Sequence, residues 1–264
     1  ADSITLSDGN NVVNSGTGND SVTLGNGNNV VDLGSGNDTL VAGNGNNVVT
    51  GGAGRDTITT GTGNDYITGG ADGDTIVLGG GEDSIRYVQA TESFGLAGAR
   101  DTVVGFGDDD TIVLETNILG AGVTGVNFVG VAKDSQEAQL AINLTKGDGI
   151  ADAVYDVSTG RLLIDVNDDG NLVAQDLAIN ILNGDGSAYS FDQATDVFSD
   201  NSFILVDTIA PQVLGLDLLS GSDTGDSASD DLTNANPVLV RVSFETAAVD
   251  GTSAKVGDVV TVSN

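Results

Sequence analysis

Apolar residues recur with a period of nine along the first part of the chain. Placing Leu6 at position one gives nine consecutive nonapeptides, from Leu6 to Arg86, without an insertion. Position two is Gly except at Ser7, and position four is Gly except at Asp72. Position eight is always aliphatic, at Val13, Val22, Val31, Leu40, Val49, Ile58, Ile67, Ile76 and Ile85. A short strand with one inward apolar residue and a Gly-rich turn buries nothing alone, so the repeats are predicted to stack.

Beyond residue 120 the nonapeptide is lost, and apolar and polar residues alternate over short stretches. This alternation predicts strands of an antiparallel cap at "VNFVGVA", "AQLAINL", "DAVYDVS", "RLLIDV", "LAINILNG" and "NSFILV". After Val206, Pro211 and clustered Ser, Gly and Asp residues indicate a boundary. We therefore expect three segments, residues 1–86, 87–206 and 207–264.

Composition restricts the core and the partners. The chain has 264 residues, 39 acidic against 8 basic, and a formal net charge of −31. Aromatic residues make up only 4%, so ladders of small β-branched side chains are expected to form the core. A surface this negative repels nucleic acid and anionic membranes and attracts multivalent cations. We therefore expect no nucleic-acid partner. Since no apolar run reaches about 18 residues, we also expect no membrane insertion.

The repeat resembles the RTX nonapeptide, G-G-x-G-x-D-x-U-x, over Asp2 to Arg86. The resemblance implies a parallel β-roll in which two nonapeptides make one coil of 18 residues. Alternate repeats then lie on opposite edges of the roll. It also implies calcium between successive turns of one edge, held by the position-six Asp and by turn carbonyls.

Position six differs between the two edges. One edge carries Asp2, Asp20, Asp38, Asp56 and Asp74, and the other carries Asn11, Asn29, Asn47, Asp65 and Asp83. Because calcium affinity rises with the number of charged oxygen ligands, we expect several ions, between residues 20/38, 38/56, 56/74, 65/83 and 2/20. Along the Asn positions we expect weak or no calcium and a ladder of stacked amides. The alternative is that turn carbonyls alone suffice there.

Two later segments add candidate ligands. "EDSIRYVQATESFGLAGARDTVVGFGDDDTIVLE" is similar to the closing segment of RTX rolls, and Asp101 lies 18 residues after Asp83, where it would close a last calcium site. "DVNDDGNLVAQD" has the spacing of an EF-hand loop, with Gly170 at position six and Asp instead of Glu at position twelve. Its candidate ligands are Asp165, Asn167, Asp169 and Asp176. The flanking residues predict strands, and the competing interpretation is an acidic β-turn.

The resemblances together give an all-β fold class. Residues 87–206 are similar to the C-terminal β region of serralysin-type RTX proteins. The segment from Val206 is similar to the start of bacterial Ig-like adhesin repeats. Only 58 residues follow Val206, whereas such a sandwich needs roughly 100, so the third segment is expected to be an incomplete Ig-like domain. The expected order is a parallel β-roll, an antiparallel β cap and a partial Ig-like β-sandwich.

Catalysis is not expected. The chain has no His and no Cys, which removes Ser-His and Cys-His nucleophiles and an imidazole base. Carboxylate pairs are abundant, so residue type alone leaves a glycosidase or lyase open. Few aromatic residues are available to stack on a sugar, and we expect no enzyme activity.

The leading hypothesis is a calcium-stabilised structural or adhesive segment of a large bacterial surface protein, exported by type I secretion. An S-layer, a fibre and an adhesin all fit. The alternative is the calcium-folding secretion module of an exported hydrolase, which the Ig-like segment disfavours. Ice binding would require a regular Thr or Asn row, and position three has none. The surface ligand is unknown, and self-association into a lattice or filament is open. An outward Val ladder at position seven fits such contacts, or simple β-propensity.

Overall fold

The computed structural model describes residues 1–89, 92–93, 100–172 and 176–206, and the backbone of 213–218 and 240–244. The chain divides into two compact units, Ala1–Val206 and Asp207–Asn264. Among the described residues, no helix has the length and apolar character needed to cross a bilayer.

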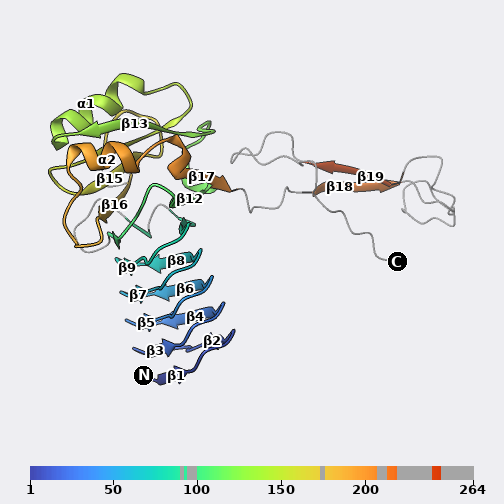
Figure 1. Cartoon of the computed structure of the whole chain (residues 1–264). Helices are drawn as coiled ribbons and strands as arrows, with labels where there is room; N and C mark the ends of the chain where they lie inside the picture. Colours follow the sequence, from blue (N-terminus) through green and yellow to red (C-terminus); the bar gives the residue numbers. More distant parts are fainter. Residues whose placement is uncertain (90–91, 94–99, 173–175, 207–212, 219–239, 245–264) are drawn as a thin grey trace, which may run out of the picture. The chain divides into compact units, whose positions relative to one another are not determined.

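The first unit begins with a roll of two parallel sheets (Figure 1). The strands of one sheet are β1 (Ser3–Leu6), β3 (Ser21–Leu24), β5 (Thr39–Val41), β7 (Thr57–Thr59), β9 (Thr75–Val77) and β11 (Thr102–Val104). Those of the other are β2 (Val12–Asn14), β4 (Val30–Ser35), β6 (Val48–Ala53), β8 (Tyr66–Ala71), β10 (Ser84–Tyr87) and β12 (Thr111–Glu115). Odd and even strands therefore alternate between the two sheets along the chain.

The coil length is 18 residues, as the resemblance implies. Ser3 pairs with Ser21 and Val12 with Val30, and the same spacing continues to β9 and β10. The position-two glycines allow this close stacking. Gly52 has φ +111°, and a Cβ added there would overlap the carbonyl oxygen of Gly34 in the previous coil. No residue with a side chain fits that position without moving the neighbouring turn.

The core of the roll is built from ladders of small aliphatic side chains. The position-eight residues from Val13 to Ile85 are all buried, and Leu24 and Leu33 join them at position one. Position-seven residues point outward, as the strand period requires; Val12 is 83% exposed while Val13 beside it is 6% exposed. The predicted parallel β-roll is confirmed.

A nine-residue insertion between β10 and β11 shifts the end of the roll. Thr102 pairs with Thr75, and Thr111 with Ser84, so both partners are 27 residues apart. The sheets then continue into the cap: β11 pairs with β16 (Leu177–Leu182), and β12 with β17 (Phe203–Val206), both in parallel.

The cap is a mixed sheet with two helices. Its strands are β13 (Val126–Ala132), β14 (Ala151–Asp156), β15 (Arg161–Asp165) and β16; its helices are α1 (Ser135–Thr145) and α2 (Phe191–Val197), with 3-10 turns at Thr116–Ile118 and Asp200–Ser202. The pairs β14–β15 and β15–β16 are antiparallel, but β13–β14 is parallel because α1 connects them. The predicted antiparallel cap is thus only partly confirmed.

The prediction of a strand at "AQLAINL" is wrong, because these residues lie in α1. Asp134 caps the helix by accepting hydrogen bonds from the main-chain nitrogens of Gln136 and Glu137. The buried residues are Ala138 and Ile142, four apart, whereas Leu144 is 77% exposed. The helical period, rather than the alternation, decides which side chains are buried.

Aromatic rings, rare in the chain, gather in the cap. Phe198 lies 4.8 Å from Tyr155 and 5.8 Å from Phe106, measured between ring centroids, in stacked pairs. Tyr189 meets both Tyr155 and Phe198 edge to face. These rings are part of the same buried cluster as the roll ladders, so the cap closes the C-terminal end of the roll core.

The second unit is described only at β18 (Val213–Leu218) and β19 (Val240–Phe244), which pair in antiparallel orientation. The remainder of the predicted incomplete Ig-like domain lies outside the described residues.

Replacing Val31 with Ala should destabilise the calcium-loaded protein by about 2 kcal/mol, because it removes two buried methyl groups and leaves a cavity. The matched control is Val30→Ala, one residue earlier on the same strand, where the side chain is 49% exposed. Urea denaturation followed by circular dichroism measures both. Equal losses from the two substitutions would contradict the assignment of inward and outward faces.

Candidate calcium sites

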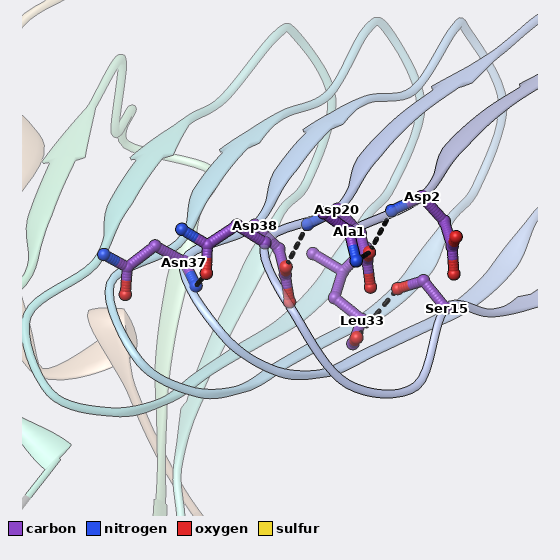
Figure 2. A network of polar contacts seen from close by, with 8 residues as sticks. Ala1, Asp2, Ser15, Asp20, Leu33, Asn37 and Asp38 are labelled. Atoms are coloured by element: carbon purple, nitrogen blue, oxygen red, sulfur yellow. Dashed lines mark hydrogen bonds and ion pairs between the residues drawn. The ribbon is translucent and has the colours of Figure 1, made fainter.

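Position-six aspartates form a column along one edge of the roll. The main-chain nitrogen of each residue donates to Oδ1 of the Asp in the next coil, at 2.7 Å for Asp20 to Asp38, 2.8 Å for Asp38 to Asp56 and 2.8 Å for Asp56 to Asp74. Figure 2 shows the start of this column at Asp2, Asp20 and Asp38. The strands to either side fix the turns, so the carboxylates repeat at the strand spacing of about 4.8 Å.

The second carboxylate oxygen has no hydrogen-bond partner. Oδ2 is buried and without a partner at Asp20, Asp38, Asp56 and Asp74 on this edge, and at Asp65 and Asp83 on the other. An ionised oxygen in this condition costs several kcal/mol unless a cation meets it. Carboxylate oxygens and main-chain turn carbonyls are the donors that calcium prefers. The residues present therefore fit calcium.

Electrostatics supports the same conclusion. Burial, together with the smaller effects of the charges of Asp101 and Asp56, raises the pKa of Asp74 to about 8. Burial likewise raises the pKa of Asp101 to about 7 and those of Asp56 and Asp83 to about 6. The protein environment alone disfavours the charges of these four carboxylates, most of all that of Asp74, and a bound cation would favour their ionised forms.

The other edge begins with the predicted amide ladder. Nδ2 of Asn11 donates to Oδ1 of Asn29 at 2.9 Å, Asn29 donates to Asn47 at 2.8 Å, and Asn47 donates to Oδ1 of Asp65 at 2.8 Å. Asn29 and Asn47 are fully buried. Each amide is neutral and carries its own donor, so it satisfies the next acceptor without a metal.

The same amides also occupy the turn carbonyls. Nδ2 donates to the carbonyl oxygen two residues earlier, at 2.9 Å in Asn11 and Asn29 and 2.8 Å in Asn47, reaching Gly9, Gly27 and Gly45. An amide at position six therefore removes the charge and also engages a carbonyl that would otherwise be available to an ion. This arrangement supports the predicted asymmetry between the edges.

Two residues at the end of the roll differ from the sequence-based expectation. Asp101 was expected to follow Asp83, but it accepts from the main-chain nitrogen of Asp74 at 2.9 Å. The partner of Asp83 is Asp110, at 2.7 Å, a residue that the sequence analysis did not single out. The nine-residue insertion moves Asp101 to the opposite edge. The spacing of nine between Asp101 and Asp110, each followed by Thr and an aliphatic residue, was the available signal.

Asp2, at the first turn, differs from the other members of its column. Its main-chain nitrogen donates to Oδ1 of Asp20 at 2.6 Å, but the residue itself is exposed. Only one buried carboxylate, that of Asp20, is present at the predicted 2/20 site.

The EF-hand-like loop lies between strands β15 and β16, as expected. Gly170, with φ +80°, donates its main-chain N–H to Oδ2 of Asp165 at 2.7 Å, and Asp169 donates to Oδ1 of Asn167 at 3.1 Å. Asp165 and Asp176 are buried, whereas Asn167 and Asp169 are exposed. Residues 173–175 of the loop lie outside the described part. The first half of the loop thus holds three of the four predicted ligand residues in one turn.

Within the described residues, no group of three or more acidic side chains is close enough to bind a metal without other ligands. A site between two coils must therefore combine two aspartates with main-chain carbonyls. Each ion would then join successive turns of one edge.

Comparison with known protein families agrees with this geometry. Four copies of the RTX calcium-binding nonapeptide repeat match residues 5–40, 25–58, 32–66 and 50–85. No curated protein matches the chain.

Exchanging the chemistry of the two edges should exchange their calcium binding. Asn29→Asp with Asn47→Asp should add calcium ions, because carboxylates replace amides in adjacent coils. Equilibrium dialysis counts the ions. The matched control, Asp38→Asn with Asp56→Asn, should bind fewer ions. An unchanged count in the first variant would show that amides do not prevent binding.

In chelator, the folded roll should become more stable as pH falls from 8 to 4. The folded pKa values of Asp56, Asp74, Asp83 and Asp101 lie at about 6 to 8, above the ordinary value of 3.8. The folded state therefore binds more protons, and this stabilisation is complete below 3.8 and lost as pH rises through 6 to 8. The folded fraction in chelator, followed by the β signal in circular dichroism across this pH range, tests the trend. A folded fraction that rises with pH would be inconsistent with these shifts.

Proposed function

We propose that this chain, whose residues 5–85 are RTX calcium-binding nonapeptide repeats, is a calcium-stabilised structural or adhesive segment of a large secreted bacterial surface protein. In this role the roll is a stiff spacer that becomes ordered when it meets extracellular calcium. Type I secretion is the export route, and the function is mechanical rather than catalytic.

One observation carries this proposal: a column of buried carboxylates whose Oδ2 atoms have no partner. Without a cation the stacked charges repel one another, and the slender ladders bury too little apolar surface to offset chain entropy. A site with a dissociation constant near 10⁻⁴ M stabilises the fold by about 1.4 kcal/mol in millimolar calcium. Five such sites supply about 7 kcal/mol, comparable to the net stability of a domain.

Calcium dependence of this size suits export. In a calcium-poor cytosol the repeats stay unfolded, and a net charge of −31 keeps the chain expanded and soluble. Outside the cell, binding and folding occur together.

The surface-protein hypothesis competes with that of a secretion module of an exported hydrolase. Two features favour the former. A second unit, with its own antiparallel strand pair β18–β19, follows the roll and cap. The chain also contains no His or Cys for nucleophilic catalysis. S-layer, fibre and adhesin remain the three forms of the proposal.

Self-association into a lattice or filament is part of the proposal, with the outer face of the even-numbered strands as its support. Val12, Val30 and Val48 are 83%, 49% and 46% exposed and are aligned in successive coils, with Tyr66 next in the row. The turns of Asn11, Asn29 and Asn47 adjoin this face, so the row of Val side chains carries no charge, and Asp32 of β4 is the charged residue exposed beside it.

Removing calcium should unfold the roll in the intact protein. The β signal in circular dichroism should fall in chelator and return when calcium is added, and the hydrodynamic radius should rise and fall in step. Magnesium at the same concentration is the control, because it requires a smaller octahedral site and dehydrates reluctantly. A β signal and radius unchanged in chelator at pH 7.5 would contradict calcium-driven folding.

A further inference from the structure

Two buried aspartates face each other in the cap, outside the roll. Asp152 on β14 and Asp165 on β15 are directly paired in the antiparallel ladder. Paired residues point to the same face of a sheet. That face is covered by α1, because Val154 and Leu163, the next pair inward, pack with Ala138 and Ile142 of the helix. Like charges placed opposite each other destabilise a strand pair unless something lies between them.

The carboxylate of Asp152 is incompletely satisfied. The residue is 1% exposed, and Asp165 is fully buried. Oδ2 of Asp152 accepts a hydrogen bond from the hydroxyl of Thr145, the last residue of α1. Oδ1 is buried and has no hydrogen-bond donor at bonding distance and angle, although the amide of Asn127, its paired residue on β13, lies near enough to lower the pKa of Asp152. An oxygen of this kind requires a ligand that supplies positive charge.

The surroundings are negative as well. Asp168, 8% exposed, accepts hydrogen bonds from the main-chain nitrogens of Gly147 at 2.6 Å and Gly149 at 2.8 Å, in the loop after α1. Its charge and that of Asp148 raise the pKa of Asp152, after the larger effect of burial. The C-terminal end of a helix, here α1, adds a partial negative charge. None of the ion pairs between described residues involves Asp152, Asp165 or Asp168.

Asp156, on the same strand and face, shows the contrasting arrangement. It is also fully buried, but Oδ2 accepts from the hydroxyl of Ser135 at 2.5 Å, and Oδ1 accepts from the nitrogen and hydroxyl of Ser158. These bonds hold the pKa of Asp156 below its usual value, although burial opposes them. Both carboxylate oxygens of Asp156 are therefore hydrogen-bonded, whereas Oδ1 of Asp152 is not.

We propose that Asp152 and Asp165 together bind a calcium ion that links β14 to the EF-hand-like loop. Asp152 supplies a carboxylate from a neighbouring strand to a loop whose twelfth position carries Asp176 in place of the longer Glu. The ion joins the end of α1, strand β14 and the loop that leads to β16. Because β16 pairs with β11 of the roll, this site stabilises the surface on which the roll ends. The inference does not depend on the roll sites.

The test compares bound calcium in the full chain carrying Asp152→Asn with that in the unchanged protein, by native mass spectrometry in millimolar calcium. The variant should bind one ion fewer. Asp148→Asn is the matched control: it makes the same charge change four residues away on an exposed side chain, and should bind the full number. Thr145→Ala removes the hydroxyl donor to Asp152. Thr145 is not a proposed ligand, so this variant should also retain the full number of ions. If the role of Asp152 were purely structural, Asp152→Asn would likewise leave the ion count unchanged.

A crystal structure of the unchanged protein grown with calcium removes any ambiguity from a misfolded variant. Anomalous density within about 2.6 Å of an Asp152 oxygen is expected. An equal ion count in Asp152→Asn and the unchanged protein overturns the proposal, as does an absence of density beside Asp152. Loss of this ion alone, with the roll ions retained, leaves the function proposed for the roll untouched.

Discussion

The structure depends on the stacking of carboxylates at the spacing of adjacent strands. Each coil places a buried Asp directly beside that of the next coil, with one oxygen bonded to the main chain and the other without a partner. These bonds and the strand ladders join successive coils without any metal, but the charge of the carboxylates is not balanced. A divalent cation between turns would balance it, because two carboxylates and the turn carbonyls are available to it there. The strands thus determine the geometry of the roll, and the residues at its edges fit a cation that would neutralise the charge.

The amide ladder on the other edge avoids buried charge at position six, because its side chains are neutral. Asparagine at position six keeps the main-chain contact to the next coil and replaces the charged oxygen with a donor, which bonds to the neighbouring amide and to the local turn carbonyl. The ladder ends at Asp65, whose Oδ2 is the first on this edge to lack a partner. One edge is therefore held by neutral hydrogen bonds in its first coils, while the other contains carboxylates throughout. The two edges are expected to respond differently to calcium.

The two sheets and the hydrophobic core of the roll continue into the cap. The odd-numbered sheet continues from β11 into β16, and the even-numbered sheet ends at β17, so no break separates the two regions. Aromatic rings, absent from the interior of the first four coils, fill the space where the ladders end. Closing one end of a stack of identical coils protects the terminal sheet edges and the last buried side chains, as in other repeat proteins. Asp152, Asp165 and Asp168 lie within this closure.

The period of nine by itself predicted that the repeats stack around an aliphatic ladder at position eight. The resemblance to the RTX repeat, rather than the period, implied two nonapeptides per coil and hence two edges, along one of which position six changes from Asn to Asp. Tertiary structure decided what lies beyond the period. The insertion after Tyr87 moves Asp101 beside Asp74 and brings Asp110 to Asp83, which counting residues cannot show because an insertion changes which edge is reached. In "AQLAINL" the helix cap at Asp134 outweighs alternation. The short turn between Asp156 and Arg161 sets the register that pairs Asp152 with Asp165. Only the tertiary structure shows that α1 covers the face of the sheet on which this pair lies.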